Sequence, residues 1–248
     1  MRSIHAIAKY ELKMQLKNIG VWLVLAFALA MSLLDNFPSA ANMKRLAFLT
    51  EQGYVVSRIL SQEGVLLLFG LMFFVSGRIR DDRKRGTMEL FMGSPLAKCQ
   101  YLWGKISGNY GFTLLMTLLL LLLNALVHFI FNPGRFTLTP YAVGFLALAI
   151  PACFFVTACA VALPMVMDIR LFYILFSVYF IINVGVISAI TRSIYLFQPD
   201  LLKLLYKYES FETIHYTKLL WNLSFLIGAG MLSFLLLSLN KRFWREVR

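Results

Sequence analysis

Residues 114–131 read LLMTLLLLLLNALVHFIF, with an unbroken leucine run at positions 118–123. A helix needs about 20 mainly apolar residues to cross the hydrocarbon core of a bilayer, and this stretch approaches that length. Other apolar runs lie on both sides of it, and the "NPG" at 132–134 ends it. The sequence therefore predicts an all-α polytopic membrane protein. Its six expected transmembrane helices cover about 19–34, 62–77, 106–131, 140–167, 170–190 and 218–240.

Composition agrees with this class. The chain has 248 residues, of which 60% are hydrophobic and 15% are charged, whereas a soluble domain carries about 25% charged residues. Nearly all of the chain is accounted for by apolar runs and short connections, so we expect a single transmembrane domain over 1–248. The net charge of +12 is spread between the apolar runs, which is typical of a topology signal. We therefore expect no nucleic acid partner.

The distribution of basic residues predicts the orientation. With the N-terminus inside, the inner segments hold two thirds of the 24 Lys and Arg residues. Basic residues accumulate on cytoplasmic loops, so both termini are expected in the cytoplasm. No cleavable signal peptide is evident, and we expect the N-terminus to be retained.

Residues 1–18, MRSIHAIAKYELKMQLKN, have the pattern of an amphipathic helix. Lys9, Lys13 and Lys17 recur every four residues and share one face. Apolar residues cluster on another side, although Glu11 and Gln15 interrupt that apolar arc. We interpret the segment as a helix in the inner membrane interface, with its lysines toward anionic headgroups of the lipid bilayer. The alternative is a solvated extension of the first membrane helix.

Residues 81–105, DDRKRGTMELFMGSPLAKCQYLWGK, form the longest charged stretch and lie on the predicted cytoplasmic side. Five charged residues are followed by alternating apolar and small residues, and Pro95 can begin a helical turn. The pattern predicts a short amphipathic helix tied closely to the second and third membrane helices. A partner that pushed this element would move both helices. The alternative is a basic loop that only sets topology.

This stretch resembles the signature segment of ABC-2 type transporter permeases. In that family a Gly-Thr is followed by an acidic residue, a leucine, Ser/Thr-Pro and a Gly-Lys at the start of the third helix. The matching positions here are Gly86, Thr87, Glu89, Leu90, Ser94, Pro95, Gly104 and Lys105. The family often has Glu-Arg-Glu-Arg before the Gly-Thr, where this chain has Asp82-Arg83-Lys84-Arg85.

The resemblance extends over nearly the whole chain. Residues 1–18 resemble the family's elbow helix. The segment 191–217 has leucines and aromatic residues at helical spacing, and it resembles the extracellular amphipathic helices before the sixth span. The C-terminal segment 210–244 is similar to the corresponding segment in the gliding-motility and nitrous-oxide-operon branch of these permeases.

The resemblance implies a mechanism. Two permease chains, identical or related, would form the membrane pathway of an exporter in the bacterial plasma membrane. A separate ATP-binding subunit would bind ATP and Mg²⁺, and a coupling helix of the permease would dock into it. The implied ATPase-coupling residues are Gly86, Thr87, Met88, Glu89, Leu90, Phe91, Ser94, Pro95 and Leu96.

The sequence lacks the motifs of an enzyme. Gly104-Lys105 does not belong to a Walker A sequence, and neither His-Glu-x-x-His nor Gly-x-Ser-x-Gly occurs. We therefore expect no catalytic residue, no bound cofactor and no metal site in this chain. Four polar residues within predicted spans are candidates to line a substrate path, or alternatively to hydrogen-bond between helices: Glu63, Asn124, His128 and Asn183.

Other functional classes stay open. A haem-exporter-type B subunit shares a similar cytoplasmic motif, but residues 1–18 and the long 191–217 segment make it a less good match. A polytopic enzyme acting on lipid or peptide would have to use Glu63, His128 or Asp168. A channel or assembly factor that works without ATP would need none of these residues. The transported substrate is not indicated by the sequence.

Overall fold

The structure is a computed structural model. It describes residues 2–36, 52–84, 86, 98–131, 136–184, 195–197 and 216–240, and these contain helices and no strand. The helices are α1 (Arg2–Leu16), α2 (Ile19–Asn36), α4 (Gln52–Ile59), α5 (Val65–Ser76), α6 (Arg78–Lys84), α8 (Lys98–Phe131), α9 (Thr139–Gly144), α10 (Ile150–Val166), α11 (Ile169–Val184) and α13 (Tyr216–Leu239). The π-helical turns η2 (Leu60–Gly64) and η4 (Phe145–Ala149) join α4 to α5 and α9 to α10.

Several helices are long and apolar enough to cross a bilayer. Within the described residues four qualify: Gln52–Asp82, Lys98–Ile130, Thr139–Val166 and Leu220–Leu239. α1 and α2 qualify only as a pair that is bent by 66°. Within the described residues the fifth predicted span is an apolar helix at 169–183 that is shorter than a span, and its expected end at 185–190 lies outside them. The protein is therefore an all-α, membrane-embedded protein with four to five helices of membrane length in its described part.

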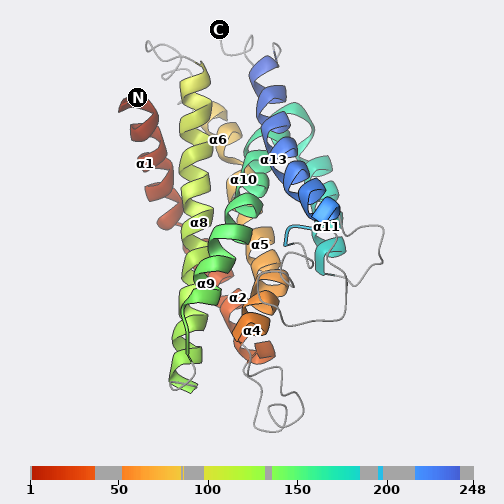
Figure 1. The fold of residues 1–248 in the computed structure, drawn as a ribbon. Helices are drawn as coiled ribbons and strands as arrows, with labels where there is room; N and C mark the ends of the chain where they lie inside the picture. Colours follow the sequence, from red (N-terminus) through yellow and green to blue (C-terminus); the bar gives the residue numbers. More distant parts are fainter. Residues whose placement is uncertain are drawn as a thin grey trace.

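The long helices alternate in direction (Figure 1). The chain leaves the α1 end along α2, returns along α4 and α5, leaves along α8, and returns along α9 and α10. It then leaves along α11 and returns along α13. α1, α6, the first turns of α8 and the last turns of α13 therefore lie at one end of the bundle. We call this the α1 end.

Two expected helix starts were wrong. The third predicted span begins at Lys98 rather than near Ile106, and the second begins at Gln52 rather than near Gln62. Hydropathy detects only the apolar part of a helix. The additional turns contain polar residues that form tertiary contacts, such as Gln52, whose side-chain oxygen accepts hydrogen bonds from the amide and hydroxyl of Thr137.

α8 is longer than the membrane requires. Its 34 residues span roughly 51 Å at about 1.5 Å per residue, against a hydrocarbon core of about 30 Å. The apolar residues 112–131 are enough to fill that core, so residues 98–111 extend beyond it at the α1 end. This extension carries the buried polar side chains Lys105 and Asn109.

α10 forms the centre of the bundle. It packs against α5, α8 and α13, and its small residues Ala152, Ala158 and Ala160 are fully buried. On its α8 side the Thr113 and Thr157 hydroxyls lie 2.9 Å apart. Such hydrogen bonds between membrane helices contribute modestly to their association.

The prolines of the fourth predicted span lie where its helix changes. Pro151 lies two residues after the end of the π-helical turn η4. It has no N–H to donate to the carbonyl four residues earlier, and its ring crowds that carbonyl, so a widened turn is a natural accommodation. Pro164 lies inside α10 near its end. Asp168 then caps α11, because its carboxylate accepts a hydrogen bond from the Arg170 amide at 2.8 Å.

Candidate functional site

The candidate coupling segment is described mainly through its two stems. α6 precedes the segment and the first turns of α8 follow it. Gly86 has a φ of +69°, a left-handed conformation that glycine adopts without steric cost. The other predicted coupling residues lie outside the described residues: Thr87, Met88, Glu89, Leu90, Phe91, Ser94, Pro95 and Leu96.

Asp82 ties the two stems together. The Tyr101 hydroxyl of α8 donates a hydrogen bond of 2.8 Å to the Asp82 carboxylate of α6. The Lys105 ammonium forms an ion pair with the same carboxylate. All three side chains are buried, so charge and hydrogen bonding join α6 to the start of α8, the two helices that flank the candidate coupling segment.

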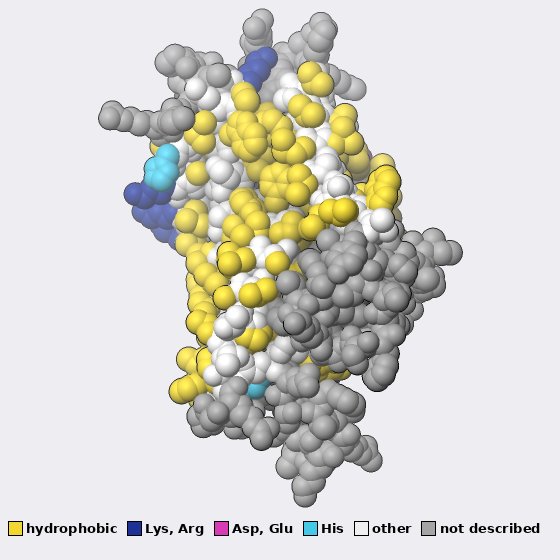
Figure 2. Space-filling model, viewed as in Figure 1, with side chains coloured by type: hydrophobic (Ala, Val, Ile, Leu, Met, Phe, Trp, Pro, Cys, Tyr) yellow, Lys and Arg dark blue, Asp and Glu magenta, His cyan; other side chains and the backbone are white. Residues whose placement is uncertain are grey.

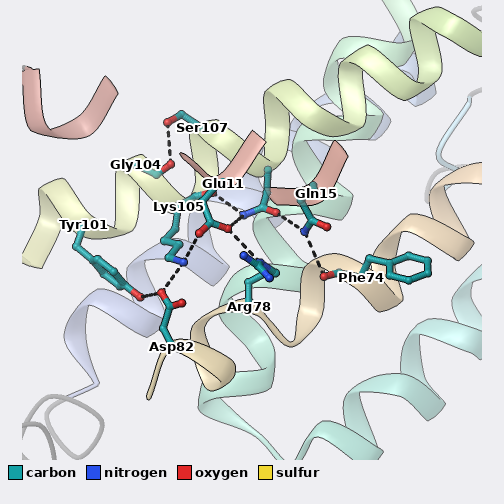
Figure 3. A network of polar contacts seen from close by, with 10 residues as sticks. Glu11, Gln15, Phe74, Arg78, Asp82, Tyr101, Gly104, Lys105 and Ser107 are labelled. Atoms are coloured by element: carbon teal, nitrogen blue, oxygen red, sulfur yellow. Dashed lines mark hydrogen bonds and ion pairs between the residues drawn. The ribbon is translucent and has the colours of Figure 1, made fainter. Parts of the chain in front are cut away.

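Glu11 extends this network of contacts to α1 (Figure 3). Glu11 is fully buried. Its carboxylate forms an ion pair with Lys105 and a second one with Arg78, whose Nε lies 3.1 Å from Oε2. One acidic residue of α1 thus contacts the first residue of α6 and the start of α8.

The side-chain amides of Gln15 and Asn109 also belong to this network of polar contacts. The Gln15 side chain donates to the Asn109 side-chain oxygen at 2.9 Å and to the Phe74 carbonyl at 3.2 Å. The Asn109 amide nitrogen donates to the Lys105 carbonyl at 2.9 Å and to Glu11 at 3.3 Å. Gln15 therefore connects α1 to the end of α5, beside the charged residues.

The charges of this ionic cluster balance. It contains the carboxylates of Glu11 and Asp82 and the cations Arg78 and Lys105. Burying an ion costs several kcal/mol, and the mutual attraction offsets that cost only when geometry is good and hydrogen bonds are satisfied. Removing one partner leaves an uncompensated charge, which makes the cluster sensitive to any movement of α1, α6 or α8.

Glycines allow α1 to approach α8. A Cβ atom at Gly108 would lie 2.6 Å from the Ala8 carbonyl oxygen, and one at Gly104 would lie 2.8 Å from the Ile7 Cβ. These two glycines are four residues apart on one face of α8, a spacing that permits close helix packing in membranes. Gly104 and Lys105, part of the motif that resembles ABC-2 permeases, thus pack and pair with α1.

Sequence reasoning missed the ionic cluster. Glu11 and Gln15 were interpreted as interruptions of an apolar arc, but they lie at the centre of the buried face of α1. The available signal was the isolated Lys105 near the start of a long apolar helix, because a cation there requires a partner. The partner's identity depends on contacts between residues 94 positions apart in the chain.

The predicted interfacial lysines are exposed. Lys9 and Lys13 lie on the exposed face of α1, opposite the ionic cluster, and the exposed Lys17 directly follows the last residue of α1. The sequence predicted a helix in the inner membrane interface with its lysines toward the headgroups, and the structure shows that the face opposite the lysines packs mainly on α8. Residues 1–18 therefore have the predicted amphipathic pattern, and α8 covers their buried face.

The candidate substrate-path residues have local roles. Asn124 accepts a hydrogen bond of 2.7 Å from the Ser32 hydroxyl of α2, and His128 lies 3.0 Å from the Tyr141 hydroxyl of α9. Glu63 lies in η2. Glu63 and His128 are each only 2% exposed. These contacts fit hydrogen bonding between helices.

Asn183 and the neighbouring Asn222 hold a short part of the predicted outer segment. Asn183 accepts a hydrogen bond of 2.6 Å from the Leu196 amide, and Asn222 donates one of 2.7 Å to the Tyr195 carbonyl. Leu196 and Phe197 are buried. Residues 195–197 thus connect α11 with α13. Most of the predicted amphipathic segment at 191–217 lies outside the described residues.

The chain matches no protein-family model, no curated protein and no solved structure. The described residues contain no group of three or more His, Cys, Asp or Glu side chains that could hold a metal ion. The ionic cluster connects α1, α6 and α8 at the α1 end.

Proposed function

We propose that this chain is the membrane-spanning subunit of an ATP-driven exporter of the ABC-2 permease type. In this proposal six membrane helices, with α1 as an elbow helix, are driven by a separate ATP-binding subunit that holds ATP and Mg²⁺. The chain itself contributes no catalytic residue. The supporting observation is the stretch 81–105, which combines the permease-like motif with the contacts of Asp82 to Tyr101 and Lys105.

The ion pair between α6 and α8 favours a coupling role over a segment that only sets topology. A topology signal requires only basic residues on the correct side. Here Asp82 on one stem pairs with Lys105 on the other, and Lys105 also pairs with Glu11. A force applied to residues 86–96 would therefore reach α6, α8 and α1 together. A coupling element needs this connection.

The proposal also includes a second permease copy, identical or related. By resemblance, the interface would involve α2 and α11. Both helices carry exposed apolar side chains, including Leu23 and Phe27 on α2 and Ile174 on α11. Lipid would cover the part of these faces that a second copy leaves free.

The test is co-purification with the ATP-binding protein encoded beside this chain. The tagged complex is extracted in mild detergent, and its stoichiometry and ATPase rate are measured for wild type, Glu89→Arg and Leu90→Asp. A two-plus-two complex whose association or coupled ATPase rate falls in both variants is the expected result. Cys99→Ser is the matched control, because Cys99 is exposed and lies just after the segment.

Two results would contradict the proposal. In one, wild type fails to associate with the ATP-binding protein in several detergents and nucleotide states. In the other, both variants behave as Cys99→Ser does in association and in coupled activity. Substrate movement without ATP in a reconstituted system would instead indicate a channel.

A further inference from the structure

Arg78 uses only part of its guanidinium group in the ionic cluster. Its Nε lies 3.1 Å from Oε2 of Glu11. The neighbouring Nη2 is buried and has no hydrogen-bond partner among the described residues. A buried donor without an acceptor keeps its full desolvation penalty, which is larger when the group is charged. The observed contact is therefore weaker than the strongest one that these two side chains can form.

The oxygen that would satisfy Nη2 is already in use. Nε and Nη2 form one fork of the guanidinium, and a carboxylate matches such a fork with both of its oxygens. In Figure 3 the Glu11 carboxylate lies between Arg78 and Lys105, and its Oε1 forms the ion pair with Lys105. Lys105 and the Arg78 fork thus compete for the same carboxylate oxygen.

Lys105 can release that oxygen because it has a second carboxylate. Its ammonium also forms an ion pair with Asp82, which accepts a hydrogen bond of 2.8 Å from the Tyr101 hydroxyl. A buried ion pair is hard to break when one charge would be left alone. Lys105 would keep Asp82 after losing Glu11, so no charge of the ionic cluster would become unpaired.

The carboxylates that take part in this competition lie inside the molecule. Glu11 is 0% exposed and Asp82 is 7% exposed. On the face of the molecule that Figure 2 shows, Lys and Arg side chains are visible at the margin and no acidic side chain is coloured. Asp81, three residues after Arg78, belongs to α6 itself, so a contact with it would not connect α6 to another helix. An exchange of partners that alters helix contacts therefore involves Glu11.

We propose that the ionic cluster is a two-position switch in which Glu11 changes partner. In the first position, shown by the structure, Glu11 bridges Lys105 and Arg78. In the second position both Glu11 oxygens accept hydrogen bonds from Nε and Nη2 of Arg78, and Lys105 pairs with Asp82 alone. All four charges stay buried and paired in both positions, so a helix displacement of about 1–2 Å is enough to select between them.

The exchange has a direction in the fold. Arg78 is the first residue of α6, Glu11 lies on α1 and Lys105 lies on α8. The second position keeps α1 attached to α6 and releases its charged contact with α8. Its use in transport rests on the proposed function: an ATP-binding subunit that moved residues 86–96 would move α6 and select the second position. Arg78 is then the positioning residue that makes α1 follow α6.

The first test uses the chain alone and asks whether Lys105 and Arg78 compete for Glu11. Arg78→Lys keeps the charge and removes the fork, whereas Lys105→Met leaves Oε1 available to that fork. Arg78→Lys should therefore lower the melting temperature in mild detergent more in the Lys105→Met background than in wild type. The expected difference is roughly 3–12 °C, because one additional hydrogen bond to a charged group is lost.

Matched variants keep this comparison specific. Arg80→Lys is the control, because it is the same substitution at an exposed position of α6, and its small effect should be equal in both backgrounds. Lys105→Gln serves if Lys105→Met does not fold. It removes the charge and keeps a hydrogen-bond donor, so the difference should be smaller and have the same sign.

The second test uses the complex with the ATP-binding subunit. Arg78→Lys should assemble as wild type does and melt within a few degrees of it, because the ammonium still pairs with Glu11. Its coupled ATPase rate should nevertheless fall by roughly 2- to 30-fold, the range expected when a coupling contact is altered. Arg80→Lys should keep the wild-type rate. A side chain that only stabilised the fold would change melting and ATPase rate together.

Two results would overturn the switch. In one, Arg78→Lys has the same effect on melting with and without Lys105, which would show that the two cations bind Glu11 independently. In the other, the complex carrying Arg78→Lys retains the ATPase rate of the Arg80→Lys complex. A wild-type chain that does not associate with the ATP-binding subunit would contradict the proposed function instead, and the melting comparison then decides the switch.

Discussion

Glu11→Gln is the most informative single substitution in this protein. It removes one charge from the ionic cluster while keeping the side-chain size, and it replaces one acceptor oxygen with an amide donor. Lys105 would retain Asp82, but Arg78 would lose the carboxylate that lies 3.1 Å from its Nε. Leaving a buried charge without its partner costs about 3–5 kcal/mol. At about 2–4 °C per kcal/mol for a chain of this size, the apparent melting temperature should fall by roughly 6–20 °C.

The assay is thermal denaturation in mild detergent, followed by the loss of monodisperse protein in size-exclusion chromatography. Asp81→Asn is the matched control, because Asp81 is adjacent to Asp82 in α6 and is half-buried. It should cost less than about 0.5 kcal/mol and shift the melting temperature by no more than about 2 °C.

A double-mutant cycle tests whether the loss of stability comes from the pair of Glu11 and Arg78. Arg78→Gln removes the charge that Glu11→Gln leaves unpaired, whereas the pair of Asp82 and Lys105 stays intact. The double variant should therefore be more stable than the sum of the single effects predicts, by about 0.5–3 kcal/mol. If Glu11→Gln behaves like Asp81→Asn, or if the two single effects add, the ionic cluster does not hold α1 in place and this reasoning fails.

Two further predictions test the packing of α8. Gly108→Ala should destabilise the protein by about 1–3 kcal/mol, because its Cβ would lie 2.6 Å from the Ala8 carbonyl oxygen. The control is Gly111→Ala, whose Cβ meets nothing within 4 Å. It should be neutral or slightly stabilising in the same melting assay. Equal effects at the two glycines would show that α1 does not approach α8 closely. Thr113→Val and Thr157→Val should each lower the stability by about 0.6 kcal/mol, because both remove the same hydrogen bond of 2.9 Å. The double variant should therefore be less destabilised than the sum of the two single effects. Additive losses in the melting assay would mean that the two hydroxyls do not interact.

The sequence pattern predicted helix bounds most accurately where those bounds depend on the surroundings of a single helix. The predicted sixth span at 218–240 agrees within two residues with α13, and the predicted first span begins at Ile19 as α2 does. The exposed lysines of α1 follow from spacing alone. The start of α8 was missed because Lys98, Gln100 and Lys105 interrupt the apolar pattern of residues 98–105, and contacts with α1 and α6 stabilise this part of the helix.

The sequence by itself determined the membrane class, the helical composition and the basic face of α1, because apolar length and helical spacing are local properties of a segment. Only the tertiary structure decided that Glu11, Arg78, Asp82 and Lys105 meet at the α1 end. A charge can be buried only where an opposite charge reaches it. That condition depends on how α1, α6 and α8 pack, aided by Gly104 and Gly108, and these contacts link residues far apart in the chain.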